Sequence, residues 1–440
     1  MNVWQATQER LGRIFRDFDN VVVAFSGGKD SGVMLNATLD YMRAHGITKK
    51  ITVLHLDYEG QYDATTRYVT EVMTANQKLI DPVWICLPFD AACEVSLYQG
   101  RWQPWNPEER DLWVRDLPDA PGILHTGNVP KGFPAYDGVW DYAFQEKVGA
   151  WLHRRSGAKR TAVMVGIRTQ ESHHRHAALY RKDRTQDSML DGLNWTSRKG
   201  SRGVYNVYPI FDWVTEDVWT ANATFGWSYN TLYDLFHLAG VGIHDMRVAS
   251  PFRGEGQAAL KLYRVIEPET WAKLVGRVNG VNFTAIYGGT RTMGVGDITL
   301  PPGHTWKTYA NFLLSTIEDE EIRQGYLRKL KTSLRYWTVT GGALPKTNAD
   351  ELRQQAPAGT EFLGEPTDNR RRAVPYEVVK FRQYPDDMPG LSDPSLLPTY
   401  KRLVVAILRN DHACKGMGFG QTKREQTKRA AAVEKYRSIL

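Results

Sequence analysis

Four short apolar runs in the first half of the chain constrain the fold more than any other feature of the sequence. They are VVVAF at 21–25, ITVLHLD at 51–57, VWICLP at 83–88 and TAVMVGI at 161–167. All are rich in β-branched residues, and none has the strict alternation of a strand with one face in water, which is typical of strands covered on both faces. The sequence therefore predicts an α/β fold built on a parallel sheet with flanking helices.

The segments between these runs predict the helices that parallel connections need. Apolar residues recur at helical spacing from Val33 to Met42, and Gly46 provides a left-handed stop. A similar helical pattern covers 64–80, and VYNVYPI at 204–210 is expected to add a fifth strand. We therefore expect a twisted sheet whose strands alternate with helices along the chain.

At 440 residues the chain is long enough for two domains with separate cores. We expect an α/β domain over 1–225, interrupted at 90–150 by a loop-rich insertion that holds several tryptophans and prolines. Amphipathic helical patterns, such as those at 306–317 and 322–337, predict a mainly helical domain over 226–440.

Charge and cysteine content bound the setting of the protein. The chain carries 56 Lys and Arg residues against 49 Asp and Glu, a net charge of +7 that suits anionic ligands without requiring DNA. Its three cysteines are too few for a disulfide framework or a self-contained iron–sulfur cluster, so we expect a reducing cytoplasm. No apolar stretch of about 18 residues occurs, so we expect a soluble protein without a membrane segment.

The first apolar run leads directly into SGGKDS at 26–31 and then into the first helical segment. Such a corner gathers unpaired backbone N–H groups and the positive end of a helix dipole around one point, which favours phosphate oxygens as the ligand. Its two glycines let the backbone approach a ligand closely. Lys29 can neutralise the charge of the ligand, while Asp30 can hold a metal or position that lysine. The predicted pyrophosphate site consists of Ser26, Gly27, Gly28, Lys29, Asp30 and Ser31.

The spacing matches neither the Walker pattern GxxxxGK[ST] nor the dinucleotide-binding pattern GxGxxG. SGGKDS after a β-branched run instead resembles the PP-loop of the ATP pyrophosphatases, whose fold is adenine nucleotide α-hydrolase-like. Members of that group split ATP between the α and β phosphates and often leave a substrate adenylated. The resemblance implies that the chain binds ATP with Mg2+, that Lys29 and Asp30 act in catalysis, and that Asp30 holds the metal.

Three further motifs follow in the order that this superfamily shows. LHLDYEGQYDATTRYV at 54–69 is similar to the segment after the second strand of phosphoadenosine phosphosulfate reductases and sulfate adenylyltransferase small subunits, which implies that Leu56 and Asp57 lie beside adenine. VGIRTQESHHR at 165–175 resembles the arginine-rich element after their fourth strand. YPIFDWVTEDVW at 208–219 resembles their P-I-x-D-W-x-x-x-D-V-W stretch.

The arginine-rich element has its own physical interpretation. Gly166 ends the fourth predicted strand, at the edge where open α/β sheets bind ligands. If a helix follows, Arg168, Glu171 and Arg175 share one face. The guanidinium groups of Arg168 and Arg175 are then expected to bind phosphate or sulfate with paired hydrogen bonds. The alternative is a surface ion pair between Glu171 and Arg175.

Cys414 is the candidate nucleophile of a competing reaction. Reductases of the superfamily carry a nucleophilic cysteine near their C terminus, and Cys414 lies in NDHACKGMGFGQ after an amphipathic helical pattern. The E-C-G-[LI]-H setting of those reductases is absent, although Lys415 can lower the pKa of the thiol. A buried structural cysteine is the alternative.

The second half of the chain is similar to a branch of reductase-like proteins of the immunoglobulin-binding regulator A type, whose members are commonly encoded beside a ParB-like protein. The segments that carry this resemblance lie at 229–252, 263–283, 303–314 and 396–421. The resemblance implies a ParB-like partner. The terminal segment 421–440 has a net charge of +4 and is expected to touch nucleic acid or an acidic partner, or to be a solvated helix.

Three functions remain open from the sequence. The first is an ATP pyrophosphatase-type enzyme that adenylates an unknown substrate in sulfur metabolism or nucleic-acid modification. The second is a thiol-dependent sulfonucleotide reductase that uses Cys414, and the third is a nucleotide-sensing regulator that acts with a ParB-like partner on DNA. The complete SGGKDS favours the first, because many sulfonucleotide reductases carry an altered loop.

Overall fold

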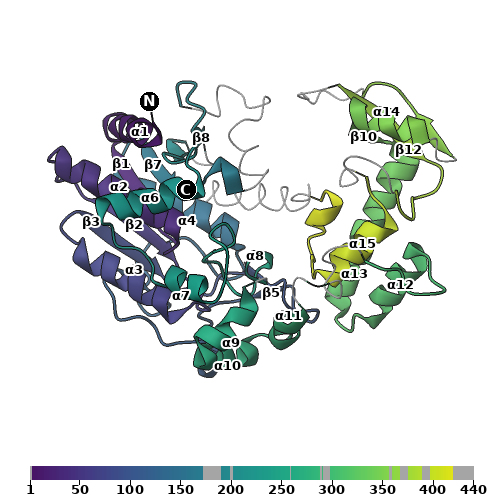
Figure 1. Cartoon of the computed structure of the whole chain (residues 1–440), viewed down its shortest axis with the longest axis horizontal. Coiled ribbons are helices and arrows are strands. Elements are labelled where there is room, and N and C mark those ends of the chain that lie inside the picture. The colour runs from purple at the N-terminus through teal and green to yellow at the C-terminus, as the bar shows by residue number, and fades with distance from the viewer. Residues whose placement is uncertain are drawn as a thin grey trace. The chain divides into compact units, whose positions relative to one another are not determined.

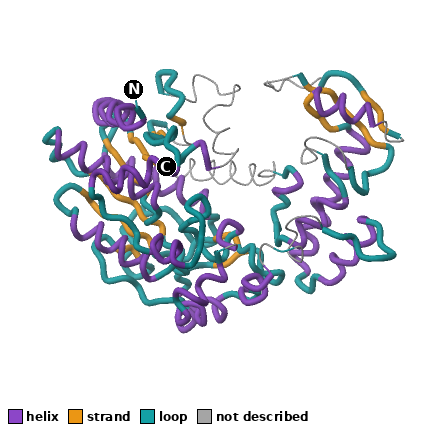
Figure 2. Tube along the Cα trace, viewed as in Figure 1, coloured by secondary structure: helices purple, strands orange, loops and turns teal. Residues whose placement is uncertain are grey.

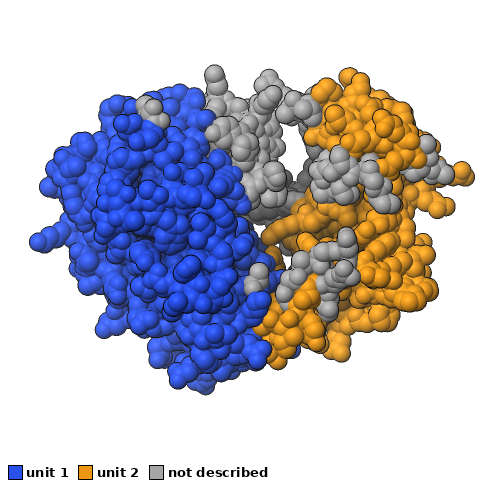
Figure 3. Space-filling model, in the orientation of Figure 1, with its two compact units in different colours: residues 1–93, 101–281 blue, residues 94–100, 282–440 orange. Residues whose placement is uncertain are grey.

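The chain folds into two compact units in a computed structural model, and the first unit combines 1–93 with 101–281 while the second combines 94–100 with 282–440 (Figure 3). The residues that the structure describes are 2–171, 190–198, 202–257, 259–287, 290, 298–355, 359–366, 375–388 and 397–419.

The first unit is organised around one sheet enclosed by helices (Figure 1, Figure 2). Within its described residues, seven strands follow the order β6-β3-β2-β1-β7-β9-β8. Only β8 runs antiparallel to its neighbour among these pairs, which confirms the predicted parallel α/β sheet. The strands are β1 (Asn20–Ala24), β2 (Ile51–Leu56), β3 (Ile80–Ile85), β6 (Ile123–Leu124), β7 (Thr161–Val165), β8 (Thr196–Arg198) and β9 (Val204–Val207).

Helices connect these strands and bury the apolar faces that the sequence indicated. Val22 and Val23 of β1 are fully buried, as expected for a strand covered on both faces. Leu35 and Leu39 of the first connecting helix are buried against the sheet core. The described helices are α1 (Val3–Asp17), α2 (Lys29–Ala44), α3 (Asp63–Ala75), α4 (Asp141–Ser156), α6 (Thr215–Phe225), α7 (Leu232–Leu238), α8 (Gly254–Gln257), α9 (Tyr263–Ile266) and α10 (Pro268–Arg277), with short 3-10 turns at Pro107–Leu112, Thr169–Glu171 and Leu260–Leu262.

The insertion at 90–150 contains more regular structure than the sequence indicated. Its strand β6 extends the main sheet by pairing parallel to β3, and α4 begins at Asp141. A small antiparallel pair of β4 (Ala91–Ala92) and β5 (Arg101–Trp102) precedes them. Trp105 is buried and packs edge-on against Trp113, with ring centroids 5.1 Å apart, so the insertion has an aromatic core.

Two fully buried carboxylates after β2 attach this insertion to the sheet. Asp57 accepts from Arg115 Nη2 at 2.6 Å and from Trp84 Nε1 at 2.7 Å. Glu59 accepts the backbone N–H groups of Trp105 at 2.7 Å and of Val114 at 3.0 Å. Buried charges of this kind persist only when they are fully paired, so these contacts fix the insertion on the carboxyl edge of the sheet.

The first unit continues past residue 225, where the sequence placed the domain boundary, and ends near Val281. The reason is packing. Tyr263 of α9 stacks on Tyr62 with ring centroids 3.6 Å apart. Arg277 of α10 donates to Glu59 through Nε at 2.8 Å and Nη2 at 3.2 Å. These helices therefore belong to the body of the α/β unit.

The second unit is mainly helical, as predicted, and its described part also contains a three-stranded antiparallel sheet in the order β10-β12-β11 that the sequence did not indicate. Ala310, Leu403 and Val404 lie in its core and are fully buried. The elements are α11 (Val281–Tyr287), α12 (Trp306–Thr316), α13 (Glu320–Arg335), a π-helical turn at Tyr336–Thr340, β10 (Gly342–Pro345), α14 (Lys346–Gln355), β11 (Thr360–Phe362), β12 (Tyr376–Phe381), α15 (Tyr400–Leu408) and a 3-10 turn at Lys415–Met417.

Among the helices of the described residues, none combines the length and the hydrophobicity needed to cross a lipid bilayer.

The buried pair of Arg277 and Glu59 gives a test of the first unit's architecture. Arg277→Met should lower the free energy of unfolding by about 3–5 kcal/mol, because it leaves the Glu59 carboxylate buried without its cation. Arg67→Met is the control, since the Arg67–Asp63 pair is mostly exposed and its loss should cost about 1 kcal/mol or less. Urea unfolding followed by tryptophan fluorescence measures both. Equal stability of the two variants would contradict this account.

Candidate functional site

The turn between β1 and α2 has a backbone that only glycine accommodates. Gly27 lies in the left-handed region at φ +76°, and a Cβ at this position would be 2.9 Å from Val69 Cγ2 and 3.0 Å from Thr65 Cγ2. Gly28 is the N-terminal cap of α2, and no side chain caps that helix end. The backbone therefore runs close to α3 on one side and ends at an uncapped helix N-terminus on the other.

Two serines hold this turn together. The Ser26 hydroxyl accepts the Gly28 N–H at 3.3 Å and contacts the Ser31 hydroxyl at 3.0 Å. Ser31 Oγ accepts the Ser26 N–H at 3.2 Å and donates to the Gly28 carbonyl at 3.1 Å. Both hydroxyls of the predicted phosphate site thus stabilise the turn itself.

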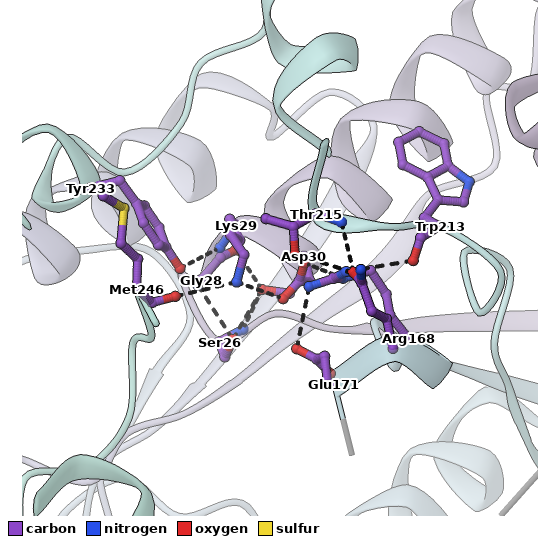
Figure 4. Close-up of polar contacts among 12 residues, drawn as sticks. Ser26, Gly28, Lys29, Asp30, Arg168, Glu171, Trp213, Thr215, Tyr233 and Met246 are labelled. Atoms are coloured by element: carbon purple, nitrogen blue, oxygen red, sulfur yellow. Dashed lines mark hydrogen bonds and ion pairs between the residues drawn. The ribbon is translucent and has the colours of Figure 1, made fainter. Parts of the chain in front are cut away.

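One carboxylate joins the two cations that the sequence singled out (Figure 4). Arg168 donates from Nε to Asp30 Oδ1 at 2.7 Å, and Lys29 donates from Nζ to Asp30 Oδ2 at 3.3 Å. Lys29 Nζ also donates to the Met246 carbonyl at 3.3 Å. Only 6% of Lys29 and 1% of Arg168 is exposed. Lys29 and Arg168 are therefore buried, while the Asp30 side chain that pairs with both of them is 15% exposed.

Burial and neighbouring charges lower the pKa of Lys29. Desolvation is the largest cause, and the positive charges of Arg168 and Arg247 act in the same direction. The carboxylate of Asp30 opposes them and raises the pKa. Because burial penalises the charged form, an added negative charge near the ammonium group would stabilise it.

The end of β7 packs directly on the first turn of α2. A Cβ on Gly166 would lie 3.1 Å from the Asp30 carbonyl carbon and from the Ser31 nitrogen, so this glycine allows the close approach. Arg168 also contacts Gln170 Oε1 at 3.2 Å and forms a weak ion pair with Glu171 at 3.7 Å. The structure thus brings Gly166 and Arg168 together with residues 26–31.

The other predicted site residues lie in different environments. Leu56 is half-buried at the end of β2, and Asp57 is enclosed by its pairs with Arg115 and Trp84. Arg175 lies outside the described residues, as does the basic terminal segment 421–440 with the contact to nucleic acid or an acidic partner expected of it. The ParB-like partner is likewise untested. Those expectations stay predictions.

Cys414 lies in the second unit and is fully buried. Burial is the main cause that raises the pKa of its thiol to about 12, and Asp411 adds to the effect. The sequence led us to expect that Lys415 lowers this pKa. Lys415 instead forms an ion pair with Glu94 at 3.4 Å, and the thiol is neutral at physiological pH.

The segment from 229 to 250 supplies contacts that the sequence did not reveal. Tyr233 of α7 accepts the Lys29 backbone N–H through its hydroxyl at 2.8 Å. Asn230 Nδ2 donates to the Gly27 carbonyl and to Thr65 Oγ1, both at 2.9 Å. In the sequence these residues belong to an ordinary amphipathic stretch about 200 positions downstream of the corner, and no spacing rule links them to it.

Asp30 as a Mg2+ ligand stays a prediction. Both of its oxygens are paired with cations of the chain, so direct coordination would require one of these pairs to open. Among the described residues, no group of three or more His, Cys, Asp or Glu side chains is arranged to hold a metal ion. The geometry of the described residues at this corner does not fit a metal held by the protein alone.

Two families match successive parts of the chain. Residues 131–242 match the phosphoadenosine phosphosulfate reductase domain, and residues 240–428 match the domain of unknown function DUF3440. The chain is 30% identical over 433 residues to the uncharacterized protein YbdN of Escherichia coli strain K12, an alignment that covers 98% of this chain and 93% of that protein.

Among solved structures, the matches include phosphoadenylyl-sulfate reductase from Candida auris in a phosphate complex, which is 16% identical. That match covers 52% of this chain and 84% of the other, with a TM-score of 0.30. They also include FMN adenylyltransferase from Candida glabrata with FAD and pyrophosphate, which is 11% identical. That match covers 52% of this chain and 59% of the other, with a TM-score of 0.31. The U34-tRNA thiolase NcsA from Methanococcus maripaludis with its [4Fe-4S] cluster is 11% identical. The match covers 64% of this chain and 79% of the other, with a TM-score of 0.29.

Gly27 gives a test of the corner's geometry. Gly27→Ala should destabilise the chain by about 1–2 kcal/mol from the left-handed backbone and by about 1–3 kcal/mol more from contact with α3. Gly46→Ala is the matched control, because Gly46 has φ +63° but no atom within 4 Å of its added Cβ. Thermal unfolding measures the difference. A Gly46→Ala loss as large as that of Gly27→Ala would show that close packing on α3 does not constrain the turn.

Proposed function

This chain belongs to the phosphoadenosine phosphosulfate reductase domain family of the PP-loop superfamily and carries a C-terminal domain of unknown function, and from that premise we propose that it is an adenylating enzyme. It binds ATP at the β1–α2 corner, transfers the adenylyl group to an oxygen nucleophile of an acceptor, and releases pyrophosphate. The members of this family are enzymes.

The observation that carries the proposal is the first turn of α2, which no side chain caps. Helix geometry leaves the N–H groups of Lys29, Asp30 and Ser31 without carbonyl partners inside the helix. Of these three groups, the Lys29 N–H donates a hydrogen bond to the Tyr233 hydroxyl. The uncapped N-terminus also carries the positive end of the helix dipole. Because Gly27 and Gly28 have no side chains, phosphate oxygens can reach these amides.

The proposed reaction needs little from the protein beyond orientation and charge. The acceptor oxygen attacks the α phosphorus, the bond to the oxygen bridging the α and β phosphorus atoms breaks, and pyrophosphate leaves with that electron pair. The amides at the helix start and the Lys29 ammonium stabilise the negative charge that develops on the leaving group. Asp30 and Arg168 act as positioning residues, because they hold the ammonium in place.

A sulfonucleotide reductase is the second candidate function, because the family takes its name from that reaction. In such an enzyme a thiolate is the nucleophile. The burial of Cys414 and its raised pKa of about 12 oppose that role. The adenylating reaction needs no thiolate, so these properties of Cys414 support the first proposal.

Lys29 provides the direct test of the ATP site. Lys29→Met, which keeps the length of the side chain but removes its charge, should weaken ATP binding by about tenfold or more, because it removes a charge-assisted contact to phosphate. Isothermal titration calorimetry and a pyrophosphate-release assay measure the effect. Lys78→Met is the control, since Lys78 is exposed. Unchanged affinity and turnover in Lys29→Met would rule out this site assignment.

Cys414 separates the two candidate functions. Cys414→Ala should leave pyrophosphate release from ATP within about twofold of the unaltered chain, since the buried thiol takes no part in adenylation. Sulfite formation from phosphoadenosine phosphosulfate with a thiol donor is measured in parallel. If the unaltered chain forms sulfite and Cys414→Ala does not, the reductase function replaces the one proposed here.

A further inference from the structure

The charges at the corner cancel within the protein. Within the part of the chain that the structure describes, Lys29 and Arg168 both pair with Asp30, and Arg168 also pairs with Glu171. Two positive charges therefore face two negative ones. A polyphosphate with several negative charges would meet a corner without net positive charge from these four side chains, although the helix dipole still favours it.

A short segment of the chain lies against the same corner. The Met246 carbonyl accepts from Lys29 Nζ at 3.3 Å. Two residues later, Val248 Cβ lies 3.7 Å from the position of a Cβ built on Gly28. Arg247 therefore lies between a residue that accepts a hydrogen bond from Lys29 and a residue that lies beside Gly28.

Arg247 differs from the other cations of the corner in its environment. It is exposed, and within the described residues it forms no ion pair or hydrogen bond. Its positive charge is close enough to Lys29 to lower the pKa of that ammonium. The guanidinium has five N–H donors in a planar fork that matches two oxygens of a phosphate, and an unpaired exposed cation loses no internal partner when it binds one.

We propose that Arg247 binds the polyphosphate of the nucleotide at the β1–α2 corner and gives the site its preference for ligands with more than one phosphate. This inference rests on the proposed function and names a residue of the same site. Asp30 and Glu171 offset the charges of Lys29 and Arg168, so Arg247 supplies the net positive charge at the corner beside the contact that Lys29 makes. Affinity should therefore rise with the number of phosphates on the ligand because of Arg247.

The test compares ATP, pyrophosphate and AMP on the full chain by isothermal titration calorimetry. Arg247→Ala should weaken ATP and pyrophosphate binding by about tenfold or more, the loss expected for a charge-assisted hydrogen bond, and should change AMP binding by less than about twofold. Arg247→Lys should recover part of the loss, because it keeps the charge without the fork. Arg43→Ala is the matched control, since Arg43 is exposed in the last turn of α2, at the other end of that helix.

The outcomes separate this inference from the function on which it rests. If Lys29→Met loses ATP binding and Arg247→Ala does not, Arg247 has no such role and the ATP site stands. An equal loss of ATP and AMP binding in Arg247→Ala also overturns the inference, because the effect would not depend on the number of phosphates. If the unaltered chain binds no ATP, both proposals fail. Equal melting temperatures of the variants confirm that folding is intact.

Discussion

The carboxylate of Asp30, which pairs with two buried cations, is the contact on which the candidate site depends. It pairs with Lys29 from its own helix and with Arg168 from the segment after β7. Because β1 and β7 are neighbouring parallel strands, with Ala24 opposite Val165, their carboxyl ends bring these side chains to one point. Removing the carboxylate would leave two nearly buried cations close together, which a protein interior does not tolerate without rearrangement. The sheet therefore sets the shape of the corner and the charge pairs maintain it.

Much of this arrangement could be predicted from local sequence. The β-branched runs predicted the parallel sheet, and SGGKDS predicted a turn that needs glycine, which the φ of +76° at Gly27 explains. Asp57 could not be placed in the same way. Its expected contact with adenine stays a prediction, but nothing in the local sequence indicated that its carboxylate is buried against Arg115, a residue of the insertion 58 positions away. Long-range pairs such as this one, or that of Tyr233 with Lys29, follow from tertiary packing and leave no periodic signal in the sequence. The same holds for the antiparallel sheet of the second unit, whose strands are short and separated by long connections.

The residues around the β1–α2 corner come from parts of the chain that belong to different family matches. Residues 26–31 precede both matched ranges, Arg168 and Tyr233 lie in the first, and Met246 and Arg247 lie in the second. The match to the domain of unknown function thus begins within the first compact unit, and its Met246 accepts a hydrogen bond from Lys29. A piece of the chain cut at residue 240 would lose these contacts, so activity is best sought in the full chain.

The most direct measurement of the central claim is a crystal structure of the full chain with a non-hydrolysable ATP analogue. The account predicts that oxygens of the β and γ phosphates lie about 2.7–3.2 Å from backbone nitrogens in the turn and first turn of α2. A nucleotide bound elsewhere on the chain, with no phosphate oxygen near the N-terminus of α2, would contradict it.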